Sequence, residues 1–174
     1  VELVVEAAIE DYKIKSQIFK NLDEKCPANT ILASNTSSLP ITKIATATNR
    51  PDKVIGMHFF NPAPVMKLIE VIKGLATSDE TVKTVVDAAK ELGKEPVEVA
   101  DFPGFAANRI VVPMLNEAIY ALMEGVATRE GIDAVCKLGY NHPMGPLALC
   151  DLIGNDVVLH VMDVLYEGYG DPKY

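Results

Sequence analysis

The sequence has few cysteines, no excess of basic residues and no long apolar run. Its three cysteines are widely spaced and form no CxxC pair, which argues against a disulfide framework or a zinc ribbon and suits a reducing cytosol. A formal net charge of −8 excludes the basic patch that nucleic acid or an acidic membrane surface requires. Apolar runs such as Leu147 to Cys150 fall far short of the ~20 residues that span a bilayer, and no signal-peptide pattern opens the chain. We therefore expect a cytoplasmic protein with no nucleic-acid or membrane partner.

Glycine is absent from the first 55 residues of the chain. All eleven glycines lie at or after Gly56, so no GxGxxG phosphate-binding loop can occur before that position. The chain begins inside the apolar run VELVVEA, and a strand of this kind needs neighbours in a parallel sheet. It ends in turn-forming residues at 167–174. We therefore expect the middle part of a longer protein, whose dinucleotide-binding loop, if it has one, lies upstream of Val1.

The first hundred residues alternate apolar runs with helical patterns. Strands are predicted at residues 1–6, 30–34, 54–60, 67–72 and 95–100, and helices at residues 11–25, 40–47 and 79–92. Strands that alternate with helices over this length predict an α/β layer with a largely parallel sheet.

After Asp101 the pattern becomes entirely helical. Asp101-Phe-Pro103 has the features of a helix start, with Asp as the cap and Pro in the first turn. Thr128 opens another helix, and residues 147–166 are helical in propensity and apolar on most faces. No low-complexity linker separates the two parts. We therefore divide the chain into an α/β part, residues 1–100, and an all-α part, residues 101–174.

His58 is the histidine whose surroundings best suit catalysis. It lies near the end of the predicted strand 54–60, and the next residues, Asn61-Pro-Ala-Pro64, cannot continue the interior of a sheet. Open α/β sheets bind ligands at the carboxyl ends of their strands. His142, in a Pro/Gly turn, and His160, in an apolar helix, fit structural roles better.

Glu70 strengthens the case for His58. Alternation along residues 67–72 places Glu70 on one face with two large aliphatic side chains, and a buried carboxylate is costly unless it is paired. The proline-rich turn can bring the two strands toward each other, so that Glu70 would fix the tautomer of a histidine that acts as a general acid/base. A purely structural buried pair is the alternative.

Two further polar residues are candidates for binding a ligand. Ser37 follows the predicted strand 30–34, where it is either a helix cap or a hydroxyl that holds a substrate oxygen. Asn108 lies about one turn into the helix expected after Asp101, near its apolar face, where an amide needs a partner such as a ligand carbonyl. No HExxH, paired-Asp loop or His/Cys cluster is present, so no metal site is expected.

Several stretches together resemble the 3-hydroxyacyl-CoA dehydrogenase family, and they run over essentially the whole chain in the family's order. They are Val4-Val-Glu-Ala-Ala-Ile-Glu10, Ala33-Ser-Asn-Thr-Ser-Ser-Leu39, Gly56-Met-His-Phe-Phe-Asn-Pro62 with Val65-Met-Lys-Leu-Ile-Glu-Val71, Asp101-Phe-Pro-Gly-Phe105 through Asn108-Arg109, and Pro143-Met-Gly-Pro146 with Asp151.

The resemblance implies a Rossmann-type sheet remnant followed by an all-α C-terminal domain. It implies an oxidoreductase that interconverts 3-hydroxyacyl-CoA and 3-oxoacyl-CoA. The expected substrate is 3-hydroxybutyryl-CoA. The cofactor would be NAD, with NADP left open, and the protein would form a homodimer through the helical part.

Each candidate residue acquires a role from this resemblance. His58 would be the catalytic acid/base and Glu70 its orienting partner, while Ser37 and Asn108 would hold the oxygen at C3 of the acyl chain. The residues implied on the cofactor side are Glu10, Lys15, Ser37 and Asn61. Without the glycine-rich loop, we expect these residues alone to bind a nicotinamide cofactor at least roughly tenfold more weakly than a complete domain.

Two alternatives stay open. The chain could be a catalytically inactive fragment, or a non-catalytic dimerisation module of the same fold. It could also be a different Rossmann oxidoreductase, of the kind that uses a catalytic lysine in a helix after the junction, where this chain has residues 105–109.

Overall fold

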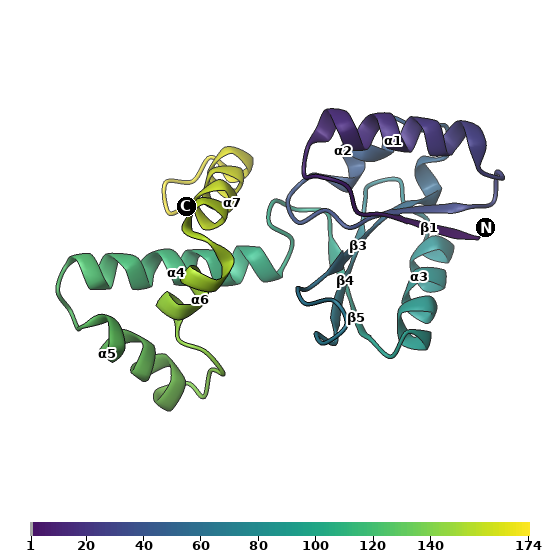
Figure 1. Cartoon of the computed structure of the whole chain (residues 1–174). Coiled ribbons are helices and arrows are strands. Elements are labelled where there is room, and N and C mark those ends of the chain that lie inside the picture. The colour runs from purple at the N-terminus through teal and green to yellow at the C-terminus, as the bar shows by residue number, and fades with distance from the viewer. Residues whose placement is uncertain (1) are drawn as a thin grey trace. The chain divides into compact units, whose positions relative to one another are not determined.

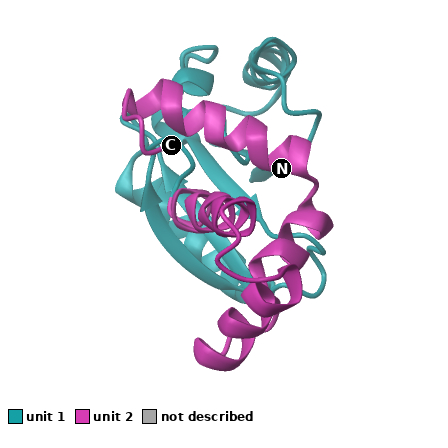
Figure 2. Cartoon of the chain, turned by 90° about the vertical axis from the view of Figure 1, so that its left-hand side faces the viewer, with its two compact units in different colours: residues 1–105 teal, residues 106–174 magenta. Residues whose placement is uncertain are grey.

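A computed structural model describes residues 2–174, which fall into two compact units (Figure 2). Unit 1 ends at Phe105 and unit 2 begins at Ala106. The strands of unit 1 are β1 (Leu3–Glu6), β2 (Ile31–Ser34), β3 (Val54–Phe59), β4 (Leu68–Lys73) and β5 (Glu95–Ala100). Its helices are α1 (Tyr12–Lys25), α2 (Ile41–Ala45), the 3₁₀ turn η1 (Pro51–Lys53) and α3 (Asp79–Glu91).

The sheet of unit 1 has its strands in sequence order, β1-β2-β3-β4-β5 (Figure 1). The pairs β1/β2, β2/β3 and β4/β5 are parallel, whereas β3 and β4 run antiparallel. The proline-rich segment after β3 is too short for a helical crossover, so the chain turns straight back as a hairpin. The predicted α/β layer with a largely parallel sheet is confirmed, and the antiparallel pair is the feature that forms the site.

Helices cover both faces of the sheet. α3 packs on one face, where Val82, Val85 and Ala89 contact sheet residues such as Ile55 and Met57. α1 and α2 pack on the other face, where Phe19 and Ile44 join the strand residues Leu32, Val54 and Ile72. The second face also carries His58 and Glu70. His58 lies four positions after Val54 on β3 and Glu70 lies two positions before Ile72 on β4, and residues an even number of positions apart on a strand share a face.

The expected start of the long helix at Asp101 is wrong. The helix begins at Ala107, and its N-cap residue Ala106 makes no side-chain capping bond. Asp101 instead caps α2, since its carboxylate accepts the backbone N–H groups of Ile41 at 3.0 Å and Thr42 at 2.7 Å. α2 needs this remote cap because its own N-cap residue, Pro40, has no side-chain acceptor.

Unit 2 is entirely helical in its described residues, as expected for the C-terminal part. Its elements are α4 (Ala107–Met123), α5 (Arg129–Ala134), the π-helical turn η2 (Val135–Gly139), α6 (Pro146–Ile153) and α7 (Asn155–Tyr169). The predicted helical stretch 147–166 is divided at Gly154, whose φ of 99° suits glycine alone. The core lies between α4, α6 and α7 and includes Leu115, Val161 and Leu165. No helix in residues 2–174 is long and apolar enough to cross a membrane.

Candidate active site

His58 and Glu70 face each other across the β3/β4 hairpin. They are direct partners in the antiparallel register, so their side chains project from the same face of the sheet. Nδ1 of His58 lies 2.8 Å from Oε2 of Glu70. Both side chains are nearly enclosed, with 6% of His58 and 2% of Glu70 exposed. β3 runs parallel to β2, so the pair lies near the carboxyl end of the strands, where α/β sheets bind ligands.

This contact fixes which ring nitrogen of His58 can react. An ionised carboxylate only accepts hydrogen bonds, so the proton shared with Glu70 resides on Nδ1. A histidine held in this way has Nε2 available for proton exchange, and a carboxylate at this distance would stabilise an imidazolium. The arrangement is suited to general acid/base chemistry.

Aromatic rings enclose the His58 imidazole. The ring of Phe60 has its centroid 4.8 Å from that of His58, and the ring of Phe105 lies at 6.0 Å. Phe105 adopts a φ of 50°, which is rare for a bulky residue and is held here by burial in the core beside α2. A helix that starts at Asp101 would include Phe105, but α4 begins at Ala107. The contact between Phe105 and His58 was therefore not predicted.

Ser37 lies on a loop that Glu10 holds in place. Oε1 of Glu10 accepts the backbone N–H groups of Ser37 at 2.9 Å and Ser38 at 3.0 Å, and it also accepts the hydroxyl of Thr36. Burial alone would raise the pKa of Glu10, but the Thr36 and Ser37 hydrogen bonds, the charge of Lys15 and the Ser38 hydroxyl outweigh it and lower that pKa below its ordinary value. Glu10 is therefore a carboxylate at neutral pH. At the start of the same loop, Oδ1 of Asn35 accepts the backbone N–H of Phe59 at 2.9 Å and so links the loop to β3.

Lys15 lies next to Glu10, with Nζ 3.6 Å from Oε2, but it is fully buried, whereas Glu10 is partly exposed. The Lys15 side chain has no exposed surface, and its ammonium group donates a hydrogen bond to the Glu6 carboxylate. Glu6 was not among the candidate residues predicted from the sequence. The spacing of Lys15 from Phe19 is the signal that could have shown the burial, because residues four apart share one face of a helix and Phe19 is a core residue.

Asn61 and Asn108 lie on separate parts of the chain. Asn61 begins the exposed β3–β4 loop with a cis bond to Pro62. The Lys94 ammonium holds that loop by donating to the backbone oxygen of Met66 at 2.8 Å. Asn108 is the second residue of α4 in unit 2 and is partly buried.

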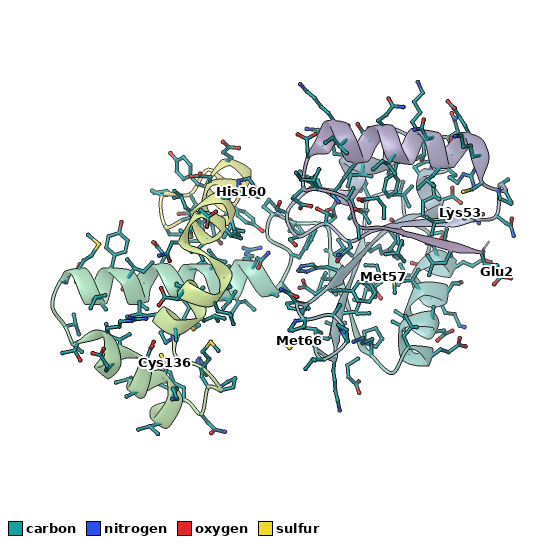
Figure 3. All side chains as sticks on the ribbon, viewed as in Figure 1. Glu2, Lys53, Met57, Met66, Cys136 and His160 are labelled. Carbon is teal, nitrogen blue, oxygen red and sulfur yellow. The ribbon has the colours of Figure 1, made fainter. Side chains whose placement is uncertain are left out.

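The remaining candidate chemistry is absent or structural. No group of three or more potential ligands in residues 2–174 could hold a metal ion. Cys150 is buried in the core of unit 2, and burial together with the charges of Asp151 and Asp133 raises the pKa of its thiol. His160 is exposed on α7, so of the two structural roles expected for it, in a core or at an interface, the structure excludes the core within this chain (Figure 3).

The sheet and its helical layers define a Rossmann-type α/β domain, and the histidine–carboxylate pair lies at the carboxyl end of its strands, where such domains bind ligands. Residues 1–102 match the family model for the 3-hydroxyacyl-CoA dehydrogenase NAD binding domain, and residues 104–174 match the model for the 3-hydroxyacyl-CoA dehydrogenase C-terminal domain. The chain therefore belongs to the 3-hydroxyacyl-CoA dehydrogenase family, as its motifs indicated.

Similar proteins cover nearly the whole chain. It is 62% identical to a probable 3-hydroxybutyryl-CoA dehydrogenase of Bacillus subtilis, over 99% of this chain and 60% of that relative. It is 59% identical to the 3-hydroxybutyryl-CoA dehydrogenase of Clostridioides difficile, over 100% of this chain and 62% of that relative. The crystal structure of (S)-3-hydroxybutyryl-CoA dehydrogenase PaaH1 from Ralstonia eutropha matches with a TM-score of 0.98 and 55% identity, over 100% of this chain and 62% of that one. The chain thus spans about three fifths of the length of these relatives.

Proposed function

We propose that the protein is an oxidoreductase that interconverts (S)-3-hydroxyacyl-CoA and 3-oxoacyl-CoA, with NAD as the cofactor and 3-hydroxybutyryl-CoA as the substrate. The observation that carries the proposal is the His58–Glu70 pair, 2.8 Å apart at the carboxyl end of β3. Family membership and the names of the relatives support the substrate class. We assign cofactor binding to residues 1–100 and the helical dehydrogenase and dimerisation part to residues 101–174, in a cytoplasmic protein.

The proton at the C3 oxygen is the part of the reaction assigned to His58. In the oxidation, Nε2 accepts the proton of the C3 hydroxyl, and the positive charge on the ring is stabilised by the adjacent Glu70 carboxylate. In the reduction, the imidazolium returns a proton to the C3 oxygen. Bound NAD supplies the hydride acceptor at C3, and bound NADH the donor in the reverse direction.

Charge that develops on the C3 oxygen needs fixed hydrogen-bond donors. We assign this role to Ser37, whose loop is held by Glu10, and to Asn108 on α4. Donors that are already oriented do not have to reorganise during the reaction, and each contributes about 3 kcal/mol at the transition state.

The residues at the ends of β1 and β2 fit the sugar hydroxyls of a nicotinamide dinucleotide. Oε1 of Glu10 accepts hydrogen bonds from the Ser37 loop. Oε2 of Glu10 lies 3.6 Å from Lys15 Nζ, and the Glu10 side chain is 30% exposed. An ionised, fixed carboxylate of this kind is a good acceptor for hydroxyl groups. We assign Glu10, Ser37 and Asn61 to the surface that faces the cofactor, with Lys15 beside Glu10 on the same side.

The test is turnover of acetoacetyl-CoA with NADH. The assay uses this chain joined to the segments of the Bacillus subtilis relative that it does not cover, which we call the extended protein. We expect one 3-hydroxybutyryl-CoA formed for each NADH consumed, and no reaction with acetyl-CoA, which lacks the 3-oxo group. A folded extended protein that consumes no NADH would leave the non-catalytic dimerisation module as the function.

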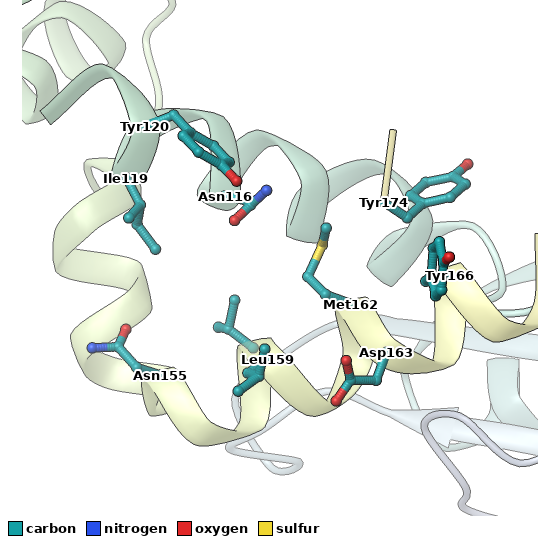
Figure 4. Close-up of a pocket in the computed structure, with 10 residues that line it drawn as sticks. Asn116, Ile119, Tyr120, Asn155, Leu159, Met162, Asp163, Tyr166 and Tyr174 are labelled. Carbon is teal, nitrogen blue, oxygen red and sulfur yellow. The ribbon is translucent and has the colours of Figure 1, made fainter. Parts of the chain in front are cut away.

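We also propose a homodimer formed through unit 2. Its outer surface carries exposed apolar side chains on adjacent helices, namely Tyr120 and Met123 of α4, Leu152 and Ile153 of α6, and Val157, Leu159 and Tyr166 of α7. A hollow of about 430 Å³ lies between α4 and α7, lined by Tyr120, Met162 and Tyr166 among others (Figure 4). A hollow with apolar rims on an exposed helical surface is typical of protein interfaces.

Replacing Leu159 by aspartate is expected to weaken the dimer at least about tenfold, because a charge would have to be buried at an apolar contact. Leu159 is 62% exposed in the single chain, so the fold tolerates the change. Light scattering across a dilution series measures the dimer. Leu75→Asp is the matched control, because Leu75 is 89% exposed but belongs to unit 1. Equal effects of the two substitutions would contradict an interface in unit 2.

A further inference from the structure

Three successive backbone amides of the loop after β2 donate to side chains. Oε1 of Glu10 accepts the N–H groups of Ser37 at 2.9 Å and Ser38 at 3.0 Å. Oγ1 of Thr36 accepts the N–H of Leu39 at 2.9 Å and, more weakly, that of Ser38 at 3.4 Å. Because these amides are satisfied by side chains, the form of the loop depends on those side chains.

The residues on either side of Ser37 turn their hydroxyl groups inward. The hydroxyls of Thr36 and Ser38 both donate to Oε1 of Glu10, that of Ser38 at 3.0 Å. Thr36 is fully buried and Ser38 is 5% exposed, whereas Ser37 between them is partly exposed. Oγ1 of Thr36 accepts two amides, which can only donate, so its single proton is available for the carboxylate. One oxygen of Glu10 therefore holds both neighbours of Ser37.

Packing alone does not call for hydroxyl groups at positions 36 and 38. A buried hydroxyl has to be desolvated, and an apolar side chain of the same shape would fill the space of Thr36 without that cost. What the hydroxyls add is direction, because a hydrogen bond fixes the position of its donor relative to the acceptor oxygen. Burial alone would raise the pKa of Glu10, and the Thr36 hydroxyl is the largest of the contributions that lower it instead.

We propose that Thr36 and Ser38 are positioning residues, whose inward hydroxyl groups fix the loop so that Ser37 is held in the orientation that meets the C3 oxygen. The inference rests on the proposed function for the role of Ser37, whereas the hydrogen bonds are a property of unit 1 alone. The competing explanation is that the two hydroxyls only stabilise the fold.

Thr36→Val is the main test, because valine has the shape of threonine and lacks the hydroxyl group. Thr36→Ser keeps the hydroxyl and lacks only a methyl group, so it should recover what Thr36→Val loses. Ser38→Ala removes the second hydroxyl and keeps every backbone amide, so it carries the measurements if Thr36→Val does not fold. Thr46→Val is the matched control, because Thr46 is exposed and its hydroxyl donates to the backbone oxygen of Lys43 at 2.7 Å.

Two measurements on the extended protein need no ligand. Carbon NMR of labelled glutamate carboxyls is expected to show a higher pKa for Glu10 in Thr36→Val and in Ser38→Ala, because the carboxylate loses a hydrogen bond. Hydrogen exchange at the backbone amide of Leu39 is expected to be about tenfold faster in Thr36→Val, because its acceptor is gone. Thr36→Ser and Thr46→Val keep both original values. A Thr36→Val variant with the original titration and exchange would overturn the proposal.

Turnover separates a positioning role from a purely stabilising one. We expect folded Thr36→Val to reduce acetoacetyl-CoA with a kcat about tenfold lower and a smaller change in KM, because the Ser37 hydroxyl is displaced from the transition state. Ser38→Ala should lower kcat in the same way, and Thr36→Ser should restore it. A kcat within about twofold of the original in both Thr36→Val and Ser38→Ala would leave the hydroxyls a stabilising role alone and overturn the proposal.

Two further outcomes have a clear meaning. A lower kcat without any change in the Glu10 titration or the Leu39 exchange would show that the hydroxyls act on the ligands directly, which also overturns the proposal. An equal loss in Thr36→Ser and Thr36→Val would assign the effect to the methyl group, with the same consequence. If the unsubstituted extended protein consumes no NADH, the proposed function fails, and the titration and exchange measurements still decide whether the two hydroxyls hold the loop.

Discussion

Replacing His58 by glutamine is expected to lower turnover of acetoacetyl-CoA by about 10³-fold, because the C3 oxygen loses its proton donor. Glutamine is the informative replacement, since its side-chain amide can still donate to the Glu70 carboxylate and so avoids a buried, unpaired charge. The fold around the pair should therefore survive, and the loss should appear in kcat more than in the affinity for NADH.

The measurement compares the initial rate and the NADH affinity of the extended protein with and without the substitution. His160→Gln is the matched control, because His160 is exposed on α7 and lies in unit 2. A His58→Gln rate within about twofold of the original would remove His58 from the chemistry, and with it the proposed mechanism.

The His58–Glu70 contact could be predicted from sequence because successive residues of a strand point to opposite faces. This geometry placed Glu70 on one face with two aliphatic side chains, and the cost of a lone buried carboxylate called for a partner. The proline-rich segment after residue 60 placed His58 near a strand end. The proline-rich segment between the strands supplied the tight return. The catalytic roles themselves came from resemblance to a family, and they stay predictions.

The role of Asp101 could not be predicted from local rules. An aspartate two residues before a proline is a common helix start, and nothing nearby in the sequence argues otherwise. In the fold, Asp101 lies next to the start of α2, where Pro40 provides no side-chain cap. It accepts the amides of Ile41 and Thr42, which are 60 and 59 residues away in the chain. Capping by a distant residue is a tertiary contact, so only the packed structure reveals it.

The burial of Lys15 could not be predicted from its motif alone. Lys15 matches a family position near the cofactor, and its charge made an exposed location the natural expectation. The structure buries it because Glu6 ends the neighbouring strand and supplies the counter-charge. Helical spacing groups Lys15 with Phe19 on the buried face, but spacing does not reveal the counter-charge that a buried lysine needs. The place of Lys15 on the cofactor side stays a prediction.

The apolar stretch of the helical part was correctly predicted to be helical, but its division was missed. Gly154 is compatible with a continuous helix at a modest cost, so sequence alone does not require a break there. The chain uses its freedom at positive φ to start a new helix at Asn155. Two helices instead of one let Cys150 and Val161 reach the same core while Leu152 and Leu159 stay exposed.

Replacing Gly56 by alanine is expected to destabilise unit 1 by about 3 kcal/mol, by forcing the two strands of the β3/β4 hairpin apart. Gly56 and Ile72 are direct partners in β3 and β4, and a Cβ at position 56 would lie 2.6 Å from Cβ of Ile72 and 3.0 Å from Cδ1 of Ile41. Cβ of Ile72 is attached directly to the backbone, so no rotamer change relieves the contact, and the strand itself has to move.

Urea unfolding followed by circular dichroism measures this loss, with Gly139→Ala as the matched control because a Cβ at position 139 would meet no atom within 4 Å. A Gly56→Ala midpoint equal to that of the control would show that the hairpin yields at no cost. The same substitution also probes the site, because the next pair on this face is His58 and Glu70. If strand spacing sets their 2.8 Å contact, turnover falls along with stability, although neither reacting side chain has been altered. Glycine at position 56 is then required by the close approach of the two strands, which is also what places the carboxylate against the imidazole.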